Sequence, residues 1–226
     1  MWPFSRKSGA THEGKPISHW VSKLSKVRTE PEAKKIESVF ARVLAKADPV
    51  ETTNKLVEML VNANNPTMAR RHAALALGNA IQYGHIDPEK SQLVVEAVHQ
   101  MLKEDQPEIN EAVLHAVAEM GKTGATLLAS LQAGLKRSKH DGELGMLCKC
   151  VGVLGPAAKS AVPLVAEVLK THKNWEVRAF AAEALGLIGR AAGPSIQVLR
   201  DALQDESGDV QQNAQEAIDR IRAAKE

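Results

Sequence analysis

The stretch NWEVRAFAAEALGLIGRAAGPSIQVLRDAL, residues 174–203, contains the pattern that decides the fold. Its first half places apolar residues at the spacing i, i+4, i+7, i+8 and i+11, which lines one face of an α-helix. These residues are Val177, Ala181, Ala184, Leu185 and Ile188. Gly189 and Gly193 interrupt this helix, and Pro194 suits the first turn of a following one, where a missing N–H costs little. The stretch therefore predicts a pair of amphipathic helices whose apolar faces are built largely from small residues.

The same helix pair recurs along the chain. Downstream, GDVQQNAQEAIDRI repeats the apolar spacing after a shift of roughly 33 residues, which is typical of a solenoid repeat. Upstream copies predict six pairs in all, separated by segments that carry Pro, Gly, Asp or Asn. The first helices are expected near 16–27, 50–62, 90–103, 125–136, 161–171 and 194–204, and the second helices near 31–47, 66–82, 107–121, 141–154, 175–189 and 208–223. No strand pattern is evident, so the sequence predicts an all-α fold, an α-solenoid (superhelix) of about six helix pairs.

Three motifs resemble HEAT repeats, especially the short bacterial kind also found in phycobilisome-lyase proteins. They are the Glu-Val-Arg start at residues 176–178, the Ala-Ala-x-Ala-Leu-Gly-x-Ile-Gly core at residues 181–189, and the Val-Pro helix start at residues 162–163. The resemblance extends over residues 100–223 and weakens toward the N-terminus, where Ala69 and Ile36 replace the expected Val. It implies an armadillo-type superhelix, a bacterial source and a role in protein–protein interaction as a scaffold or adaptor, not an enzyme.

Composition fits one repeat domain preceded by a short tail. We expect residues 1–14 to be a disordered tail and residues 15–226 to form the solenoid. Trp2 and Phe4 of the tail could touch a membrane, but no apolar run approaches the roughly 20 residues that span one. The formal net charge of +2 does not argue for nucleic acid. Basic residues outnumber acidic ones in residues 1–50, and acidic residues prevail in residues 199–226, which leaves self-assembly through the two ends open.

No catalytic, metal or cofactor motif stands out. Cys148 and Cys150 lie two apart on one predicted helix and point in different directions, so they do not form half of a CxxC site, and a structural role in a reducing, cytoplasmic compartment is expected. His72, His99 and His115 have no second ligand at a chelating i+4 spacing. Phosphate-binding glycine loops and nucleophile elbows are absent from the sequence. We therefore expect no enzymatic activity, no cofactor and no metal.

In a HEAT solenoid the second helices line the concave side, so their non-core positions are the expected partner-binding residues. These are Arg71, Leu75, Glu111, Leu114, His115, Lys149 and Glu183. One ladder across the repeats reads Leu75, His115, Lys149, Glu183 and Glu216, which lacks the series of cations that a phosphate backbone requires. On this prediction Leu114→Arg weakens a bound partner and leaves the fold intact, whereas Ala181→Arg overpacks the core.

The preferred hypothesis is therefore a scaffold that binds a protein or peptide segment on its concave face. Two alternatives remain: an accessory protein of the lyase or chaperone kind, resembling phycobilisome-lyase HEAT proteins, and a nucleic-acid-binding HEAT-like protein.

Overall fold

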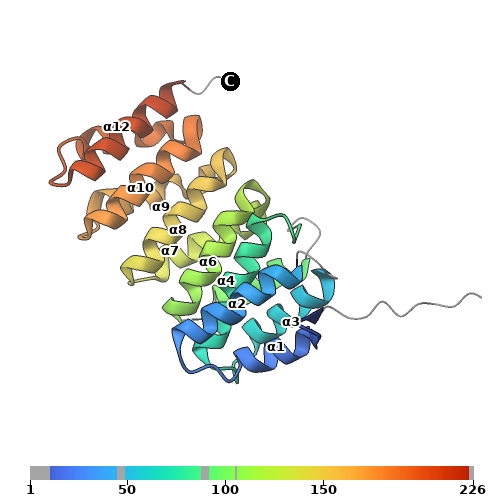
Figure 1. The fold of residues 1–226 in the computed structure, drawn as a ribbon. Helices are drawn as coiled ribbons and strands as arrows, with labels where there is room; N and C mark the ends of the chain where they lie inside the picture. Colours follow the sequence, from blue (N-terminus) through green and yellow to red (C-terminus); the bar gives the residue numbers. More distant parts are fainter. Residues whose placement is uncertain (1–10, 45–48, 88–91, 105, 224–226) are drawn as a thin grey trace, which may run out of the picture. The chain divides into compact units, whose positions relative to one another are not determined.

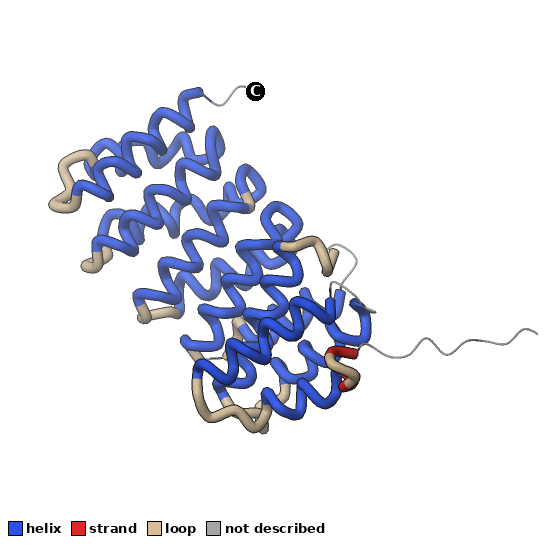
Figure 2. The backbone as a smooth tube through the Cα atoms, in the orientation of Figure 1, coloured by secondary structure: helices blue, strands red, loops and turns tan. Residues whose placement is uncertain are grey.

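Stacked helix pairs make up almost all of the regular structure that is described (Figures 1 and 2). The computed structural model describes residues 11–44, 49–87, 92–104 and 106–223. The chain divides into two units, Met1–Ala97 and Val98–Glu226, with the boundary inside helix α5 (Gln92–Met101). The predicted tail overlaps the undescribed residues 1–10, so Trp2 and Phe4 lie outside the described part of the chain.

The second unit repeats the predicted pair with a short helical connection between neighbours. Its α-helices after α5 begin and end within a few residues of the predicted ranges. They are α6 (Pro107–Met120), α7 (Leu128–Arg137), α8 (Asp141–Val153), α9 (Val162–Thr171), α10 (Trp175–Ile188), α11 (Ile196–Ala202) and α12 (Gly208–Ala223). Figure 1 shows α6, α8, α10 and α12, the second helices of the pairs, side by side in one layer.

Three 3₁₀ helices connect one pair to the next and were not expected from the sequence. They are η2 (Gly121–Leu127), η3 (Gly155–Ala161) and η4 (Gly189–Ser195). Each begins with a glycine of positive φ, 55° at Gly121, 60° at Gly155 and 70° at Gly189. Residues with a Cβ rarely adopt this backbone conformation. The glycines that end the repeats therefore turn the chain back toward the first helix of the next pair.

The first unit follows the same order of helices after a short strand pair. Its helices are α1 (Ile17–Leu24), α2 (Glu30–Leu44), α3 (Pro49–Val61) and α4 (Thr67–Gln82), followed by most of α5. No strand was predicted, but β1 (Thr11–His12) pairs antiparallel with β2 (Lys15–Pro16), with Thr11 opposite Pro16 and His12 opposite Lys15. Two-residue strands carry no apolar alternation, which is why the sequence did not reveal them.

Small residues let the second helices of unit 2 approach at backbone contact. A Cβ placed on Gly186 would lie 2.8 Å from the Cα atom of Ala217 in α12, and one on Gly152 would lie 2.9 Å from the Cα atom of Ala184 in α10. The predicted core residues of the opening stretch are correspondingly buried, with Ala181, Ala184, Leu185 and Ile188 fully inaccessible. We call these contacts the glycine–alanine seam, and they fix the spacing of α8, α10 and α12.

Candidate functional site

The seam leaves each second helix of unit 2 with one narrow stripe that faces solvent. On α10 this stripe carries Glu176, Phe180, Glu183 and Leu187, which follow one another at i, i+4, i+7 and i+11 and so share one side of the helix. Corresponding residues on α8 and α6 extend the surface across the layer. We define the second-helix face as the following exposed or half-buried residues: Glu111, His115, Met146, Lys149, Glu176, Phe180, Glu183 and Leu187.

Four of the predicted site residues lie on this face. Glu111 and Lys149 are exposed, and His115 and Glu183 are half-buried with accessible side chains. Two others, Arg71 and Leu75, belong to α4 in the first unit, where each is half-buried. The described structure therefore brings together only part of the predicted set within one unit.

Leu114 does not belong to a surface, and this part of the prediction was wrong. Its side chain is 0% exposed, as are those of Cys148 and Ala182, which sit at similar positions on their helices. The reason is that Leu114 lies where α6 packs against α8, and the Cys150 thiol of α8 donates to its carbonyl oxygen at 3.0 Å. A charged side chain at Leu114 would disrupt the fold and would not report on binding.

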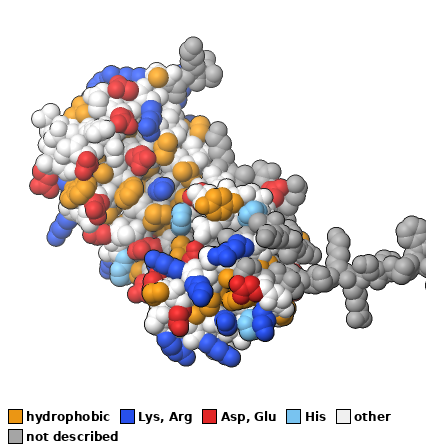
Figure 3. Space-filling model, viewed as in Figure 1, with side chains coloured by type: hydrophobic (Ala, Val, Ile, Leu, Met, Phe, Trp, Pro, Cys, Tyr) orange, Lys and Arg blue, Asp and Glu red, His pale blue; other side chains and the backbone are white. Residues whose placement is uncertain are grey.

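Phe180 and Leu187 are the surface residues that sequence reasoning missed. Their side chains are 37% and 38% exposed, although large apolar groups of this kind are usually covered. Both residues fall outside the apolar stripe that begins at Val177, and this position on the helix was the sequence signal that could have indicated their exposure. Figure 3 shows apolar side chains interleaved with acidic ones on the side of the molecule that carries α8 and α10.

A pocket of about 230 Å³ opens between α6, α8 and α10 on this face. Two glycines make room for it: the Phe180 ring lies over Gly145, where a Cβ would be 2.9 Å from Cδ2, and the Glu111 carboxylate lies over Gly142. The lining combines three carboxylates with apolar side chains. The residues are Glu111, Asp141, Gly142, Gly145, Met146, Glu176, Val177 and Phe180.

The charge of this face is predominantly negative. Asp141 accepts a hydrogen bond from the Asn174 amide at 2.7 Å, and His172 lies 3.6 Å away. Neither Glu111 nor Glu176 has an ion-pair partner among the described residues. Among the residues that define the face, Lys149 is positively charged whereas Glu111, Glu176 and Glu183 are negatively charged, so negative charge is in excess.

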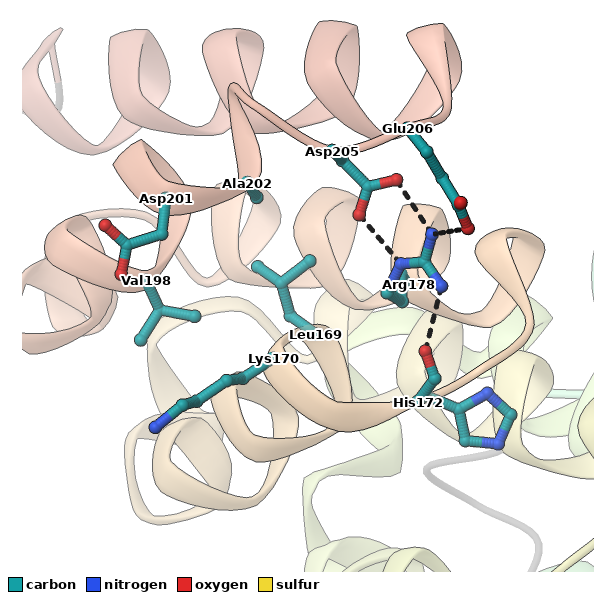
Figure 4. Close-up of a pocket in the computed structure, with 9 residues that line it drawn as sticks. All are labelled: Leu169, Lys170, His172, Arg178, Val198, Asp201, Ala202, Asp205 and Glu206. Carbon is teal, nitrogen blue, oxygen red and sulfur yellow. Dashed lines mark hydrogen bonds and ion pairs between the residues drawn. The ribbon is translucent and has the colours of Figure 1, made fainter.

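Arg178 lines a second pocket, of about 370 Å³ (Figure 4), and its contacts show that this residue stabilises the fold. Arg178 donates to both carboxylate oxygens of Asp205 at 2.8 Å and to Glu206 at 3.2 Å. Two further hydrogen bonds, of 2.9 and 2.8 Å, go to the carbonyl oxygens of His172 and Lys173. These bonds tie α10 to the loops before it and before α12. Arg70 is its counterpart in the first unit, buried and bonded to the carbonyl of Leu60 at 2.7 Å.

In the first unit, a buried histidine lies between two carboxylates. The two ring nitrogens of His72 lie 2.8 Å from Glu37 Oε2 and 3.1 Å from Glu30 Oε2, and Arg71 Nη1 lies 3.1 Å from the latter oxygen. The hydrogen bond to Glu37 is the largest influence that raises the pKa of His72, and burial opposes it. A protonated imidazole donates to both carboxylates, so this cluster joins α2 to α4 most firmly when His72 is charged.

The first unit also contains a cavity of about 490 Å³ between α1 and α2. Lys23 Nζ lies 5.0 Å from the ring centroid of Trp20, and Lys26, Lys35 and Arg42 also line the cavity. Glu13 and Glu32 line the same cavity, so it carries charges of both signs. Its lining does not point to one ligand class.

The two cysteines are buried thiols, and the described residues hold no cluster of metal-binding side chains. Cys148 and Cys150 are free and buried, and burial raises the pKa of the Cys148 thiol to about 12 and the pKa of Cys150 above its ordinary range. The Cys150 thiol donates to the carbonyl of Leu114 at 3.0 Å. Across ranges 11–44, 49–87, 92–104 and 106–223, no three His, Cys, Asp or Glu side chains gather as a metal site would require. None of the described helices combines the length and apolarity that a membrane span needs.

Comparison with known proteins identifies the repeats. The family model for HEAT repeats matches residues 128–219, which confirms the predicted resemblance over that segment. A search of curated proteins finds no match to this chain.

Solved structures share the fold at low sequence identity. An engineered protein is 19% identical with a TM-score of 0.66, and the match covers 92% of this chain and 96% of that one. The complex of CpcE and CpcF of phycocyanin lyase from Nostoc sp. PCC7120 is 17% identical with a TM-score of 0.57, covering 94% and 79%. Importin beta is 18% identical with a TM-score of 0.56, and the match covers 92% of this chain but 29% of that one. These likenesses confirm the predicted α-solenoid and concern the fold alone.

Proposed function

Because residues 128–219 carry HEAT repeats, we propose that this chain is a non-catalytic interaction scaffold that binds a partner segment on the second-helix face of unit 2. The observation that carries the proposal is the exposure of two large apolar side chains, Phe180 and Leu187, on one stripe of α10 beside a pocket. Exposed apolar side chains grouped around a concavity are typical of a site that another molecule covers.

A preformed helical surface also suits this role energetically. The seam beneath the face holds α8, α10 and α12 at backbone contact, so the receiving side chains are positioned before a partner arrives. Binding to such a surface costs little ordering of the scaffold itself, and the partner segment bears most of the entropy loss.

Crosslinking in a native lysate tests this function. A photoreactive benzoylphenylalanine replaces Leu187, and the captured proteins are identified by mass spectrometry. We expect specific adducts that disappear when Phe180→Ser is added to the crosslinking variant, because the aromatic anchor of the site is then lost.

The matched control is Tyr83→Ser, since Tyr83 is an exposed aromatic residue, 66% accessible, that belongs to the first unit and not to the second-helix face. Adducts that persist in the Phe180→Ser variant, or that depend on Tyr83, would rule out the proposed face.

A further inference from the structure

The chemistry of the second-helix face also indicates what kind of segment it receives. We propose that the partner is a basic amphipathic peptide segment, with a Lys or Arg side chain in the pocket lined by Glu111, Asp141 and Glu176 and an apolar side chain on Phe180 and Leu187. This inference rests on the proposed function and adds the charge and pattern of the ligand.

The first argument is the position of the carboxylates relative to the apolar lining. The pocket presents Met146, Val177 and Phe180 as well as the carboxylates of Glu111 and Glu176. Lys and Arg side chains place their aliphatic stems along apolar surface while the charged end stays near polar groups. A cationic side chain therefore matches both parts of this lining, whereas an anionic or purely apolar side chain matches only one.

The second argument is charge that the protein itself leaves unbalanced. Within the described part of the chain, Glu111 and Glu176 make no ion pair, although Glu216 and Asp205 elsewhere in the unit are each paired with arginine. Charges of one sign around a concavity raise the local concentration of the opposite sign and steer its approach. The same negative charge repels phosphate, which disfavours nucleic acid and anionic lipid as occupants of this face.

The third argument is the order of groups along α10. Glu176, Phe180, Glu183 and Leu187 alternate carboxylate and apolar side chains along one stripe. A segment that lies along this stripe meets acidic and apolar positions in turn. Cationic and large apolar side chains that alternate on one side of the segment complement that order.

Selection from a phage-displayed library of random 12-residue peptides tests the inference. The purified full chain is the target, and each enriched peptide is then tested for binding to the Phe180→Ser/Leu187→Ser variant. We expect enriched peptides with net positive charge and at least one large apolar residue. A synthetic peptide of the consensus sequence should bind about tenfold more weakly to Glu111→Gln/Glu176→Gln, and its affinity should fall as salt is raised.

Glu167→Gln is the matched control, because Glu167 is an exposed acid on α9, in the layer of first helices, and its loss should leave affinity unchanged. Circular dichroism melting of each variant establishes that the fold is retained. Enriched peptides that are acidic or uncharged, or no enrichment at all, would overturn the basic-segment inference.

The outcomes separate this inference from the proposed function. Peptides that lose binding in Phe180→Ser/Leu187→Ser but carry no positive charge would leave the scaffold function standing and refute the basic segment. Basic peptides that bind this variant as well as the wild type would refute the location and with it both proposals.

Discussion

Replacing Arg178 by alanine should destabilise the second unit more than any exposed arginine substitution. The Arg178 side chain is 9% exposed, and its guanidinium donates to Asp205, Glu206 and two backbone carbonyls, of which Figure 4 draws that of His172. In its absence the Asp205 carboxylate, itself 12% exposed, keeps only the bond from the backbone N–H of Ser207. Alanine therefore removes the cation that neutralises the Asp205 carboxylate in a largely buried position.

The expected loss is about 3 kcal/mol of unfolding free energy, the lower end for breaking a buried ion pair, because Glu206 on the outer side is exposed. For a unit of this size, that corresponds to a melting temperature about 10 °C lower. Arg178→Lys should recover only part of the loss, since an ammonium group does not make the paired contact with both oxygens of Asp205.

Thermal unfolding followed by circular dichroism measures the effect, with Arg222→Ala at the exposed end of α12 as control. The pH dependence supplies a second check. The hydrogen bond from Arg178 holds the pKa of Asp205 below its ordinary 3.8, so the stabilisation is present above that pH and disappears as the pH falls through the lowered value. A melting temperature of Arg178→Ala within experimental error of Arg222→Ala at pH 7 would refute the reasoning.

Three further predictions concern other parts of the chain. Gly186→Ala should destabilise the second unit by about 1 kcal/mol in chemical denaturation, because an overpacking cost of about 1–3 kcal/mol exceeds the gain in helix propensity. Gly208→Ala, with open space around the added Cβ, should be neutral or stabilising. Equal denaturation midpoints for the two variants would contradict this. The pKa of His72 is raised in the folded state, so protonated His72 stabilises the first unit fully below the ordinary pKa of 6.5. This contribution should vanish as the pH rises through the higher folded value. Urea denaturation at a series of pH values should therefore show a fall in unfolding free energy that His72→Gln lacks. Cys148 and Cys150 should resist a thiol reagent in the native state and react on unfolding, because both thiols are buried and fully protonated at neutral pH; rapid native labelling would show that the layer of second helices opens.

The helix pairs could be predicted closely because their signals are local. Apolar residues recur at helical spacing from Val177 to Ile188, and glycine, proline or asparagine stands at the ends, as in the Asn174 side chain that caps α10 by accepting from the Glu176 N–H. The 3₁₀ connections could not be predicted in this way. Segments such as η3 have no apolar period of 3.6, and they adopt their conformation where the chain turns between two packed pairs.

The binding surface was only partly predictable for a different reason. Glu183 and Lys149 were placed outward correctly because charged side chains avoid burial. Alanine and cysteine give no such signal, because they occur both at surfaces and in cores; Cys148 and Ala182 are fully buried. Leu114 was misplaced because the apolar pattern of one helix does not indicate how many neighbours surround it.

The glycine–alanine seam limits which positions of the chain can accept amino-acid substitutions. Where Gly152 meets Ala184 and Gly186 meets Ala217, backbones touch and almost any larger side chain is forbidden, so these positions are fixed by packing alone. The outward stripe above them is less constrained: Phe180 and Leu187 contact α8 at Gly145 and Gly152, but each stays more than a third exposed. The exposed stripe can therefore accept more substitutions than the seam, and the specificity of the face can change one helix at a time while the seam keeps the helices in place.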